Sequence, residues 1–336
     1  VLHWITMKFG LVIPAERPKA GDPDKIRNEL VEQSTMAEEL GFESLWIGEH
    51  HFMDHIYFNN IETLSYLSGL TNEILLGTSV CLVPLYNPVR LAEYAANLDV
   101  LSDGRFVFGC GIGYRKKEFE VLNIPRERRA PRMEEAISIM KRLWTEDMVG
   151  FEGKEFSFDE VSIMPKPIQE QGPPIWIGAK QPPAIRRAAK IGHAWLRPPS
   201  LRLAEIKRLT EVYDNELEKV GRISTEMPIW REVYVENDKR NGLNQARKNL
   251  IEKYTVYAEM DNTTVNQQSV TKEFNDYSKD RFAIGSPDEI ISYIERCQES
   301  LDIDHFIIRT QWLGMDSELG KASLVRFGKE IIPSFS

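Results

Sequence analysis

Side chains that can transfer protons or bind a metal ion lie together in the stretch LWIGEHHF, residues 45–52. Glu49, His50 and His51 follow an apolar run, and His55 comes four residues after His51, so three of the six histidines lie between positions 50 and 55. An imidazole exchanges protons near neutral pH, and imidazole and carboxylate groups also ligate transition metals. The spacing therefore allows two chemistries, acid–base catalysis or metal binding.

A metal site would use His51 and His55, spaced i, i+4, with Glu49 nearby. The histidines at 193 and 305 lie at the predicted starts of later strands, whereas this cluster follows a strand end. No HxH pair follows the first apolar run, so ligands from other strand ends are missing. The sequence therefore favours proton transfer without a metal ion.

The elements that position these residues are predicted by short apolar runs that alternate with helical patterns, which is typical of parallel βα units. Eight such runs span residues 8–14, 43–49, 74–83, 105–113, 174–179, 193–198, 228–236 and 305–312. Eight strands with intervening helices fit a single α/β domain of the (β/α)8 TIM-barrel class better than a doubly wound sheet.

The strand ends of such a barrel meet at its mouth, because the βα loops form the open face. Glu49, His50 and His51 end the second run. Neighbouring side chains on a strand point in opposite directions. We therefore expect one histidine to enter the mouth and the other to pack outward.

Two segments interrupt the regular alternation. Residues 148–172 predict a small hairpin and a proline-rich connection, and residues 237–284 form an unusually long strand connection. An insertion of that length is usually functional, so we interpret 237–284 as a lid. We expect one domain over residues 7–336, with residues 1–6 an extension or tag remnant, because Met7 opens the first strand.

Glycines and small residues mark three strand ends. The fourth run carries glycines at 109, 111 and 113, which indicate either tight barrel packing or room for a flat ligand. The fifth run ends in IGAKQPPA (177–184), where a short loop enters a helix and can bind an anion. Gly77, Thr78 and Ser79 indicate a bulge or irregular peptide geometry in the third run.

Composition narrows the partners and the compartment. A net charge of −9 disfavours a nucleic-acid surface. The basic stretch RERRAPR (126–132) is either a solvated face or a set of arginines beside an anionic ligand. The cysteines at 81, 110 and 297 are too far apart for a CxxC motif. We expect a cytoplasmic protein, since neither a membrane span nor a leader is evident.

A family resemblance rests on motifs that occur in order from Met7 to about residue 330. They are MKFGLVIP, GFESLWIGEHHF, ILLGTSVCLVPLYNPVRLAE, VLSDGRFVFGCGIGYRKKEF, RMEEAISIMKRLW, MPKPIQ, PPIWIGA and GSPDEI. The set resembles the bacterial luciferase-like monooxygenase family. The resemblance implies a (β/α)8 barrel that binds a reduced flavin, either FMN or the deazaflavin coenzyme F420, and forms a homodimer.

Site residues follow from the same resemblance. It places the catalytic histidine at His50, with Glu49 and His51 in support, and a non-proline cis peptide at Ser79 and Val80. The cofactor-binding positions that it implies are Ser79, Val80, Gly109, Gly111, Arg115, Arg132, Gly178, Ala179, Lys180 and Gln181.

The sequence departs from luciferase at the phosphate site. Gly111 and Ile112 stand where luciferase has a cysteine and a phosphate-binding arginine, and Lys180 replaces an acid. Pro182 and Pro183 remove two amides from the phosphate-binding turn. The phosphate charge would therefore be met by Arg115, Lys180 or Arg132.

The resemblance implies a monooxygenase that uses O2 and FMNH2 from a separate, diffusing flavin reductase, forming a C4a-hydroperoxyflavin that oxygenates a small organic substrate. His50 would manage its protons, and the long insertion would exclude water. The alternatives are F420-dependent hydride transfer and a non-catalytic flavin-binding protein. Five aromatic side chains near strand ends could line the substrate pocket, although a core role is favoured for each: Phe52, Tyr86, Trp195, Trp230 and Trp312.

Overall fold

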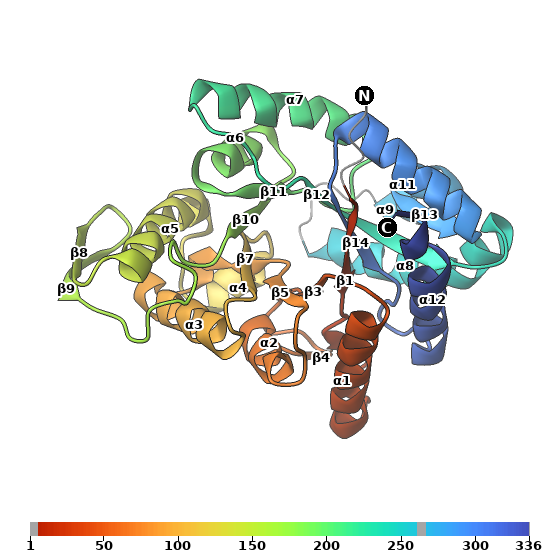
Figure 1. Cartoon of the computed structure of the whole chain (residues 1–336), viewed down its shortest axis with the longest axis horizontal. Coiled ribbons are helices and arrows are strands. Elements are labelled where there is room, and N and C mark those ends of the chain that lie inside the picture. The colour runs from red at the N-terminus through yellow and green to blue at the C-terminus, as the bar shows by residue number, and fades with distance from the viewer. Residues whose placement is uncertain (1–5, 261–266, 336) are drawn as a thin grey trace.

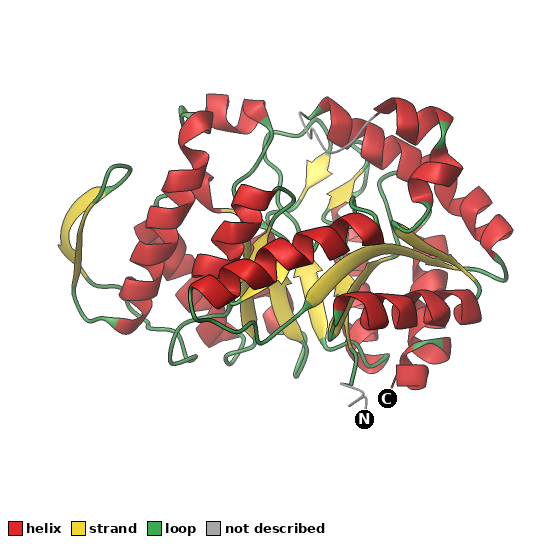
Figure 2. Ribbon diagram, turned by 90° about the horizontal axis from the view of Figure 1, so that it is seen from above, coloured by secondary structure: helices red, strands yellow, loops and turns green. Residues whose placement is uncertain are grey.

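Eight parallel strands form the centre of the molecule, and helices surround them (Figures 1 and 2). The computed structural model describes residues 6–260 and 267–335, with only the backbone described for 267–269. The strands are β1 (Lys8–Val12), β3 (Ser44–Ile47), β5 (Leu75–Thr78), β7 (Phe106–Gly111), β10 (Ile175–Gly178), β11 (Ala194–Leu196), β12 (Pro228–Val235) and β14 (His305–Arg309).

The strand order closes into a ring. The hydrogen-bonded sequence runs β11-β10-β7-β5-β3-β1-β14-β12. A parallel bridge between Arg197 and Ile229 joins the end of β11 to β12, and the Trp230 amide donates to the Arg197 carbonyl at 3.0 Å. The (β/α)8 barrel predicted from the sequence is therefore confirmed, and each predicted run contains one strand of the ring.

The helices follow the strands along the chain. Asp22 caps the first of them by accepting from the Asp24 amide, and Ser286 and Glu289 form a reciprocal capping box at a later one. The helices in the described residues are α1 (Pro23–Glu39), α2 (Asn60–Ser68), α3 (Pro88–Leu101), α4 (Lys116–Val121), α5 (Arg129–Thr145), α6 (Pro182–Ile191), α7 (Leu203–Lys219), α8 (Lys239–Glu259), α9 (Gln267–Lys272), α10 (Phe274–Ser278), α11 (Pro287–Leu301) and α12 (Ser317–Glu330). Within the same residues, no helix has the length and apolar character to cross a membrane.

Side chains alternate between the barrel interior and the helix layer. Leu45 and Ile47 pack in the large cluster between sheet and helices, whereas Trp46 points inward and stacks on Trp176 at 4.8 Å. A Cβ at Gly77 would lie 2.3 Å from the Trp46 ring, so a glycine is required beside it. Indole rings thus fill the barrel interior at this level.

The two irregular segments have definite structure. β8 (Val149–Glu152) and β9 (Ser157–Val161) form the predicted antiparallel hairpin, which projects from one side of the molecule (Figure 1). The insertion 237–284 contains α8, α9, α10 and β13 (Phe282–Gly285), which pairs with the second half of β12.

Parts of two predicted segments cannot be compared with the structure. Residues 261–266 of the insertion lie outside the described residues, as do residues 1–5 of the predicted N-terminal extension. The lid and the domain boundaries stay predictions.

Candidate active site

His50 lies buried where the chain leaves β3, held between two partners. Its Nδ1 lies 3.0 Å from Glu118 Oε1, and its Nε2 lies 3.2 Å from the Tyr114 hydroxyl. An ionised carboxylate only accepts, so the Nδ1–H donates to Glu118 and Nε2 is left to accept or exchange a proton. Glu118, on α4, thereby fixes both the tautomer and the orientation of the ring.

Glu118 was not assigned a role from the sequence, although it lies in the GYRKKEF motif. Its Oε1 also accepts from the His51 amide at 3.0 Å. The Arg115 guanidinium donates to the carbonyls of His51 and Phe52. These contacts hold the loop after β3 against α4. The hydrogen bonds that the structure gives for Arg115 go to this loop. Its contact with a phosphate group stays a prediction.

His51 points away from His50, as the strand alternation predicted. Its Nε2 lies 2.7 Å from Glu49 Oε1, and Glu49 also accepts from the Leu82 amide and the Tyr86 hydroxyl. Burial lowers the pKa of His51, but the hydrogen bond and charge of Glu49 outweigh it, so the pKa of His51 is raised. Glu49 and His51 are thus placed to brace the strand end.

The peptide between Ser79 and Val80 is cis, as the resemblance predicted. The Val80 side chain fills the space beside two of the predicted cofactor-binding glycines. A Cβ on Gly111 would lie 2.8 Å from Val80 Cγ2, and one on Gly178 would lie 3.0 Å from Cγ1. At Gly109 a Cβ would meet the Thr78 carbonyl at 1.8 Å. Tight packing therefore explains these glycines, and their contact with a cofactor stays a prediction.

The loop after β10 ends in the cap of α6. Gln181 is the N-cap residue, followed directly by the two prolines. Lys180 lies 5.9 Å from the centre of the Tyr114 ring. Burial, together with the charge of Lys253, lowers the pKa of Lys180 to about 8. Trp195 donates its indole N–H to the Ala179 carbonyl at 2.9 Å and packs in the helix layer, which makes it a core residue.

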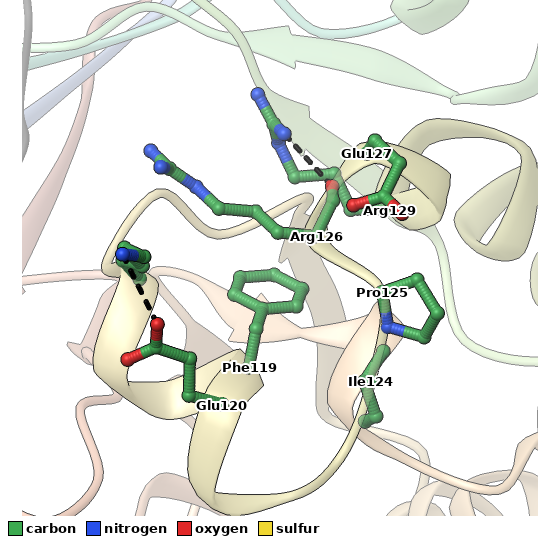
Figure 3. A pocket seen from close by; sticks show the side chains of 8 residues that line it. Phe119, Glu120, Ile124, Pro125, Arg126, Glu127 and Arg129 are labelled. Atoms are coloured by element: carbon green, nitrogen blue, oxygen red, sulfur yellow. Dashed lines mark hydrogen bonds and ion pairs between the residues drawn. The ribbon is translucent and has the colours of Figure 1, made fainter.

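A basic pocket of about 600 Å³ opens between α4 and the start of α5 (Figure 3). It is lined by Lys116, Phe119, Glu120, Ile124, Pro125, Arg126, Glu127 and Arg129. Figure 3 shows the guanidinium groups of Arg126 and Arg129 on the same side of the pocket, above Phe119. Burial lowers the pKa of Arg129, and the charges of Arg126 and Arg187 lower it further. Cations that repel each other in this way favour a bound anion.

These arginines were only partly anticipated by the sequence. The Arg129 Nε is buried without a hydrogen-bond partner, and Arg187 comes from α6, far along the chain. Arg132 lies elsewhere, with its guanidinium 4.6 Å from the Phe156 ring and its Nε directed at the Pro84 carbonyl. The sequence allowed two interpretations of the basic stretch, a solvated face or arginines beside an anionic ligand. The second interpretation suits Arg129, whereas Arg132 packs against the hairpin.

A second, narrow pocket lies at the barrel mouth beside His50. Its lining residues are Glu16, His50, Met53, His55, Tyr57, Lys253, Val256, Tyr257, Met260 and Leu313. Two buried ion pairs border it, Arg309 with Glu16 and Lys253 with Glu232. Burial raises the pKa of Glu16, but the charges of Arg309 and Lys253 outweigh it and hold the pKa at about 2. In the part of the chain that the structure describes, no three His, Cys, Asp or Glu side chains gather as a metal site.

The barrel thus combines a carboxylate-oriented histidine at its mouth with a basic pocket between α4 and α5. The chain belongs to the luciferase-like monooxygenase family, whose sequence profile matches residues 7–302. It is 27% identical over 350 residues to the oxygenase component of a flavin-dependent trigonelline monooxygenase from Acinetobacter baylyi, covering 98% of this chain and 96% of that one.

Further relatives include F420-dependent enzymes. The chain is 30% identical over 330 residues to an F420-dependent glucose-6-phosphate dehydrogenase from Microbacterium testaceum, with 91% and 93% of the two chains covered. Among solved structures, a monooxygenase from Streptomyces bottropensis matches the fold with a TM-score of 0.85 at 23% identity, over 98% of this chain and 100% of that one. The protein is therefore an oxidoreductase of the luciferase-like type.

Proposed function

We propose that this protein is the oxygenase component of a two-component flavin-dependent monooxygenase. It takes reduced FMN from a separate reductase and, with O2, inserts one oxygen atom into a small organic substrate. The observation that carries the proposal is the His50 imidazole, which Glu118 fixes through Nδ1 and which lines the mouth pocket.

The residues present suit the cofactor. The basic pocket offers the Arg129 guanidinium, whose buried Nε lacks an acceptor among the described residues, with the charge of Arg126 beside it. A phosphate group supplies acceptors of the required charge. When bound, reduced FMN supplies the electrons that activate O2. Val80 and the strand ends around it lie at the mouth, where the flat ring would rest.

The other residues of the mouth serve the reaction in distinct ways. His50 holds or moves a proton at Nε2. Glu49 and His51 keep the strand end rigid. α8 brings Lys253, Val256 and Tyr257 to the mouth pocket, which supports a role of the insertion 237–284 in excluding water there.

The test is a reductase-coupled oxidation assay of the His50→Ala variant. Loss of the proton-handling group should lower kcat by about a hundredfold or more, while the affinity for FMN changes little. Glu118→Gln, which keeps the shape of the side chain but loses the charge, should give an intermediate loss. Unchanged turnover in His50→Ala would contradict the catalytic assignment, and flavin binding without any oxidised product would favour a non-catalytic flavin protein.

A second candidate is hydride transfer to or from coenzyme F420. The F420-dependent relative from Microbacterium testaceum matches this chain over a similar length and at 30% identity. Ultraviolet–visible titration with FMN and F420 separates the two functions. Tight binding of F420 and none of FMN would reverse the order of preference.

A further inference from the structure

Lys253 is a buried cation at the barrel mouth with unused donor capacity. Its ammonium donates to Glu232 on β12 and lies 5.4 to 5.5 Å from the ring centres of Trp230, Tyr254 and Tyr257. An ammonium group carries three N–H donors. Among the described residues, Glu232 is its one hydrogen-bond acceptor. The remaining donors face aromatic rings and the narrow pocket.

Trp230 adds a second donor in the same place. Its ring centre lies 5.5 Å from the Lys253 ammonium, and its indole N–H is buried without a hydrogen-bond partner. Leaving a buried donor unsatisfied costs about 1–3 kcal/mol. A ligand that brings an acceptor to this place would satisfy both side chains.

The carboxylates of the mouth are already engaged. Glu16 accepts from Arg309, and Glu232 accepts from Lys253, from the Tyr254 hydroxyl at 3.1 Å and from the Trp312 indole. Neither acid is therefore left to meet the spare donors.

The ion pairs of the mouth leave neither of these acids free for a ligand cation, because each carboxylate faces one cation of its own. The groups without an acceptor among the described residues are donors of Lys253 and Trp230, which favour a ligand that brings an acceptor.

We infer that the substrate is an organic anion whose carboxylate binds Lys253 Nζ and the Trp230 indole N–H, with the rest of the molecule directed towards His50. The pocket measures about 20 Å³, which suits a carboxylate group rather than a whole ring. It is lined by both Lys253 and His50, so an anchored carboxylate keeps the reacting part near the imidazole. This inference rests on the proposed function, because it takes the mouth pocket as the substrate site.

The test is calorimetric titration of the full chain with benzoate, benzyl alcohol and N-methylpyridinium as probes. Benzoate should bind about tenfold or more tightly than benzyl alcohol, because only benzoate offers a charged acceptor. Trp230→Phe removes only the indole N–H and should weaken benzoate binding by about threefold to tenfold without affecting benzyl alcohol.

Removing the ammonium requires a paired change, since Glu232 would otherwise be buried without its partner. The double variant Lys253→Met with Glu232→Gln should lose about tenfold or more in benzoate affinity. Lys248→Met is the matched control, because Lys248 is an exposed lysine on the same helix, and it should bind benzoate like the parent.

Several outcomes would overturn the inference: benzoate binding no tighter than benzyl alcohol, N-methylpyridinium binding best, or unchanged benzoate affinity in the double variant. An FMN titration of each variant separates this result from the proposed function. Normal FMN binding with no preference for benzoate defeats the substrate inference alone. The expected benzoate pattern without FMN binding defeats the cofactor proposal alone.

Discussion

Two buried histidines of this protein differ in the hydrogen-bond partners that surround them. His50 has a carboxylate on Nδ1 and a hydroxyl near Nε2, so the ring can change its protonation without losing its position. His305 lies inside the barrel with Nε2 2.8 Å from the Ser44 hydroxyl, and no carboxylate of the described residues bonds to it. The same side chain therefore has a proposed role in proton transfer at the mouth and a packing role inside the barrel.

The buried His305 predicts an acid-sensitive fold. Burial lowers the pKa of His305 from 6.5 to about 3. Between these values the unfolded chain binds a proton that the folded chain does not, so the free energy of unfolding falls as the pH drops from 6.5 towards 3. The slope for one such proton is at most about 1.4 kcal/mol per pH unit.

The measurement is urea unfolding of the parent and of His305→Gln at a series of pH values. The variant should lose part of the pH dependence below 6.5, because glutamine does not titrate. Identical slopes in both proteins would show that His305 does not contribute. The Glu16 carboxyl, whose pKa is lowered from 4.5 to about 2, adds to the pH dependence below 4.5, but it is present in both proteins and cancels in the comparison.

The sequence predicted the features of site residues that depend on near neighbours, but not the contacts between distant positions. The different directions of His50 and His51 were predicted from alternation along a strand, although both residues lie past the end of β3 and are oriented by Glu118 and Glu49. The pairing of His50 with Glu118 joins positions 68 residues apart, and no spacing rule reports such a contact. The convergence of Arg129 with Arg187 of α6 depended in the same way on how the barrel closes.

Elements were predicted best where they are buried on both faces. The barrel strands read as apolar runs because helices cover one side and indole rings fill the other. α9 and α10 were not predicted, since helices of six and five residues are too short to show a helical period. Only the structure shows that Val270, Phe274 and Tyr277 on these helices are buried core residues.

Strand β5 supplies a test of how closely the barrel interior is packed. Gly77→Ala should lower the free energy of unfolding by about 1–3 kcal/mol, because the new methyl group would collide with the Trp46 ring. Gly69→Ala is the matched control, since no neighbouring atom lies within 4 Å of its Cβ position. Urea denaturation measures both. A destabilisation by Gly69→Ala equal to that by Gly77→Ala would refute the packing argument.

On the scale of the whole molecule, α2, α3 and their ends carry four exposed large apolar side chains. The two helices pack against each other on one flank of the barrel (Figure 1). Leu101 is 62% exposed and Tyr66 50% exposed, and Tyr94 and Leu70 belong to the same pair of helices and their ends. A cluster of large exposed apolar side chains is typical of a protein–protein contact.

We therefore expect the homodimer that the resemblance implies to form through α2 and α3. Light scattering coupled to size-exclusion chromatography should show a dimer for the parent and mostly monomer for Leu101→Glu combined with Tyr66→Glu, since like charges would face each other across a twofold axis. Ile223→Glu is the control, because Ile223 is 88% exposed and lies away from both helices in the sequence. A dimer that survives the double change would place the contact elsewhere.

The stack of Trp46 on Trp176 also limits the routes by which a molecule can reach His50. Because the rings fill the barrel interior, they close the route through the barrel at that level. In the proposed function, cofactor, oxygen, substrate and product would therefore share the approach from the mouth, and the molecule bound deepest would enter first and leave last. Two indole rings with no proposed role in proton transfer would then set the order of binding and release.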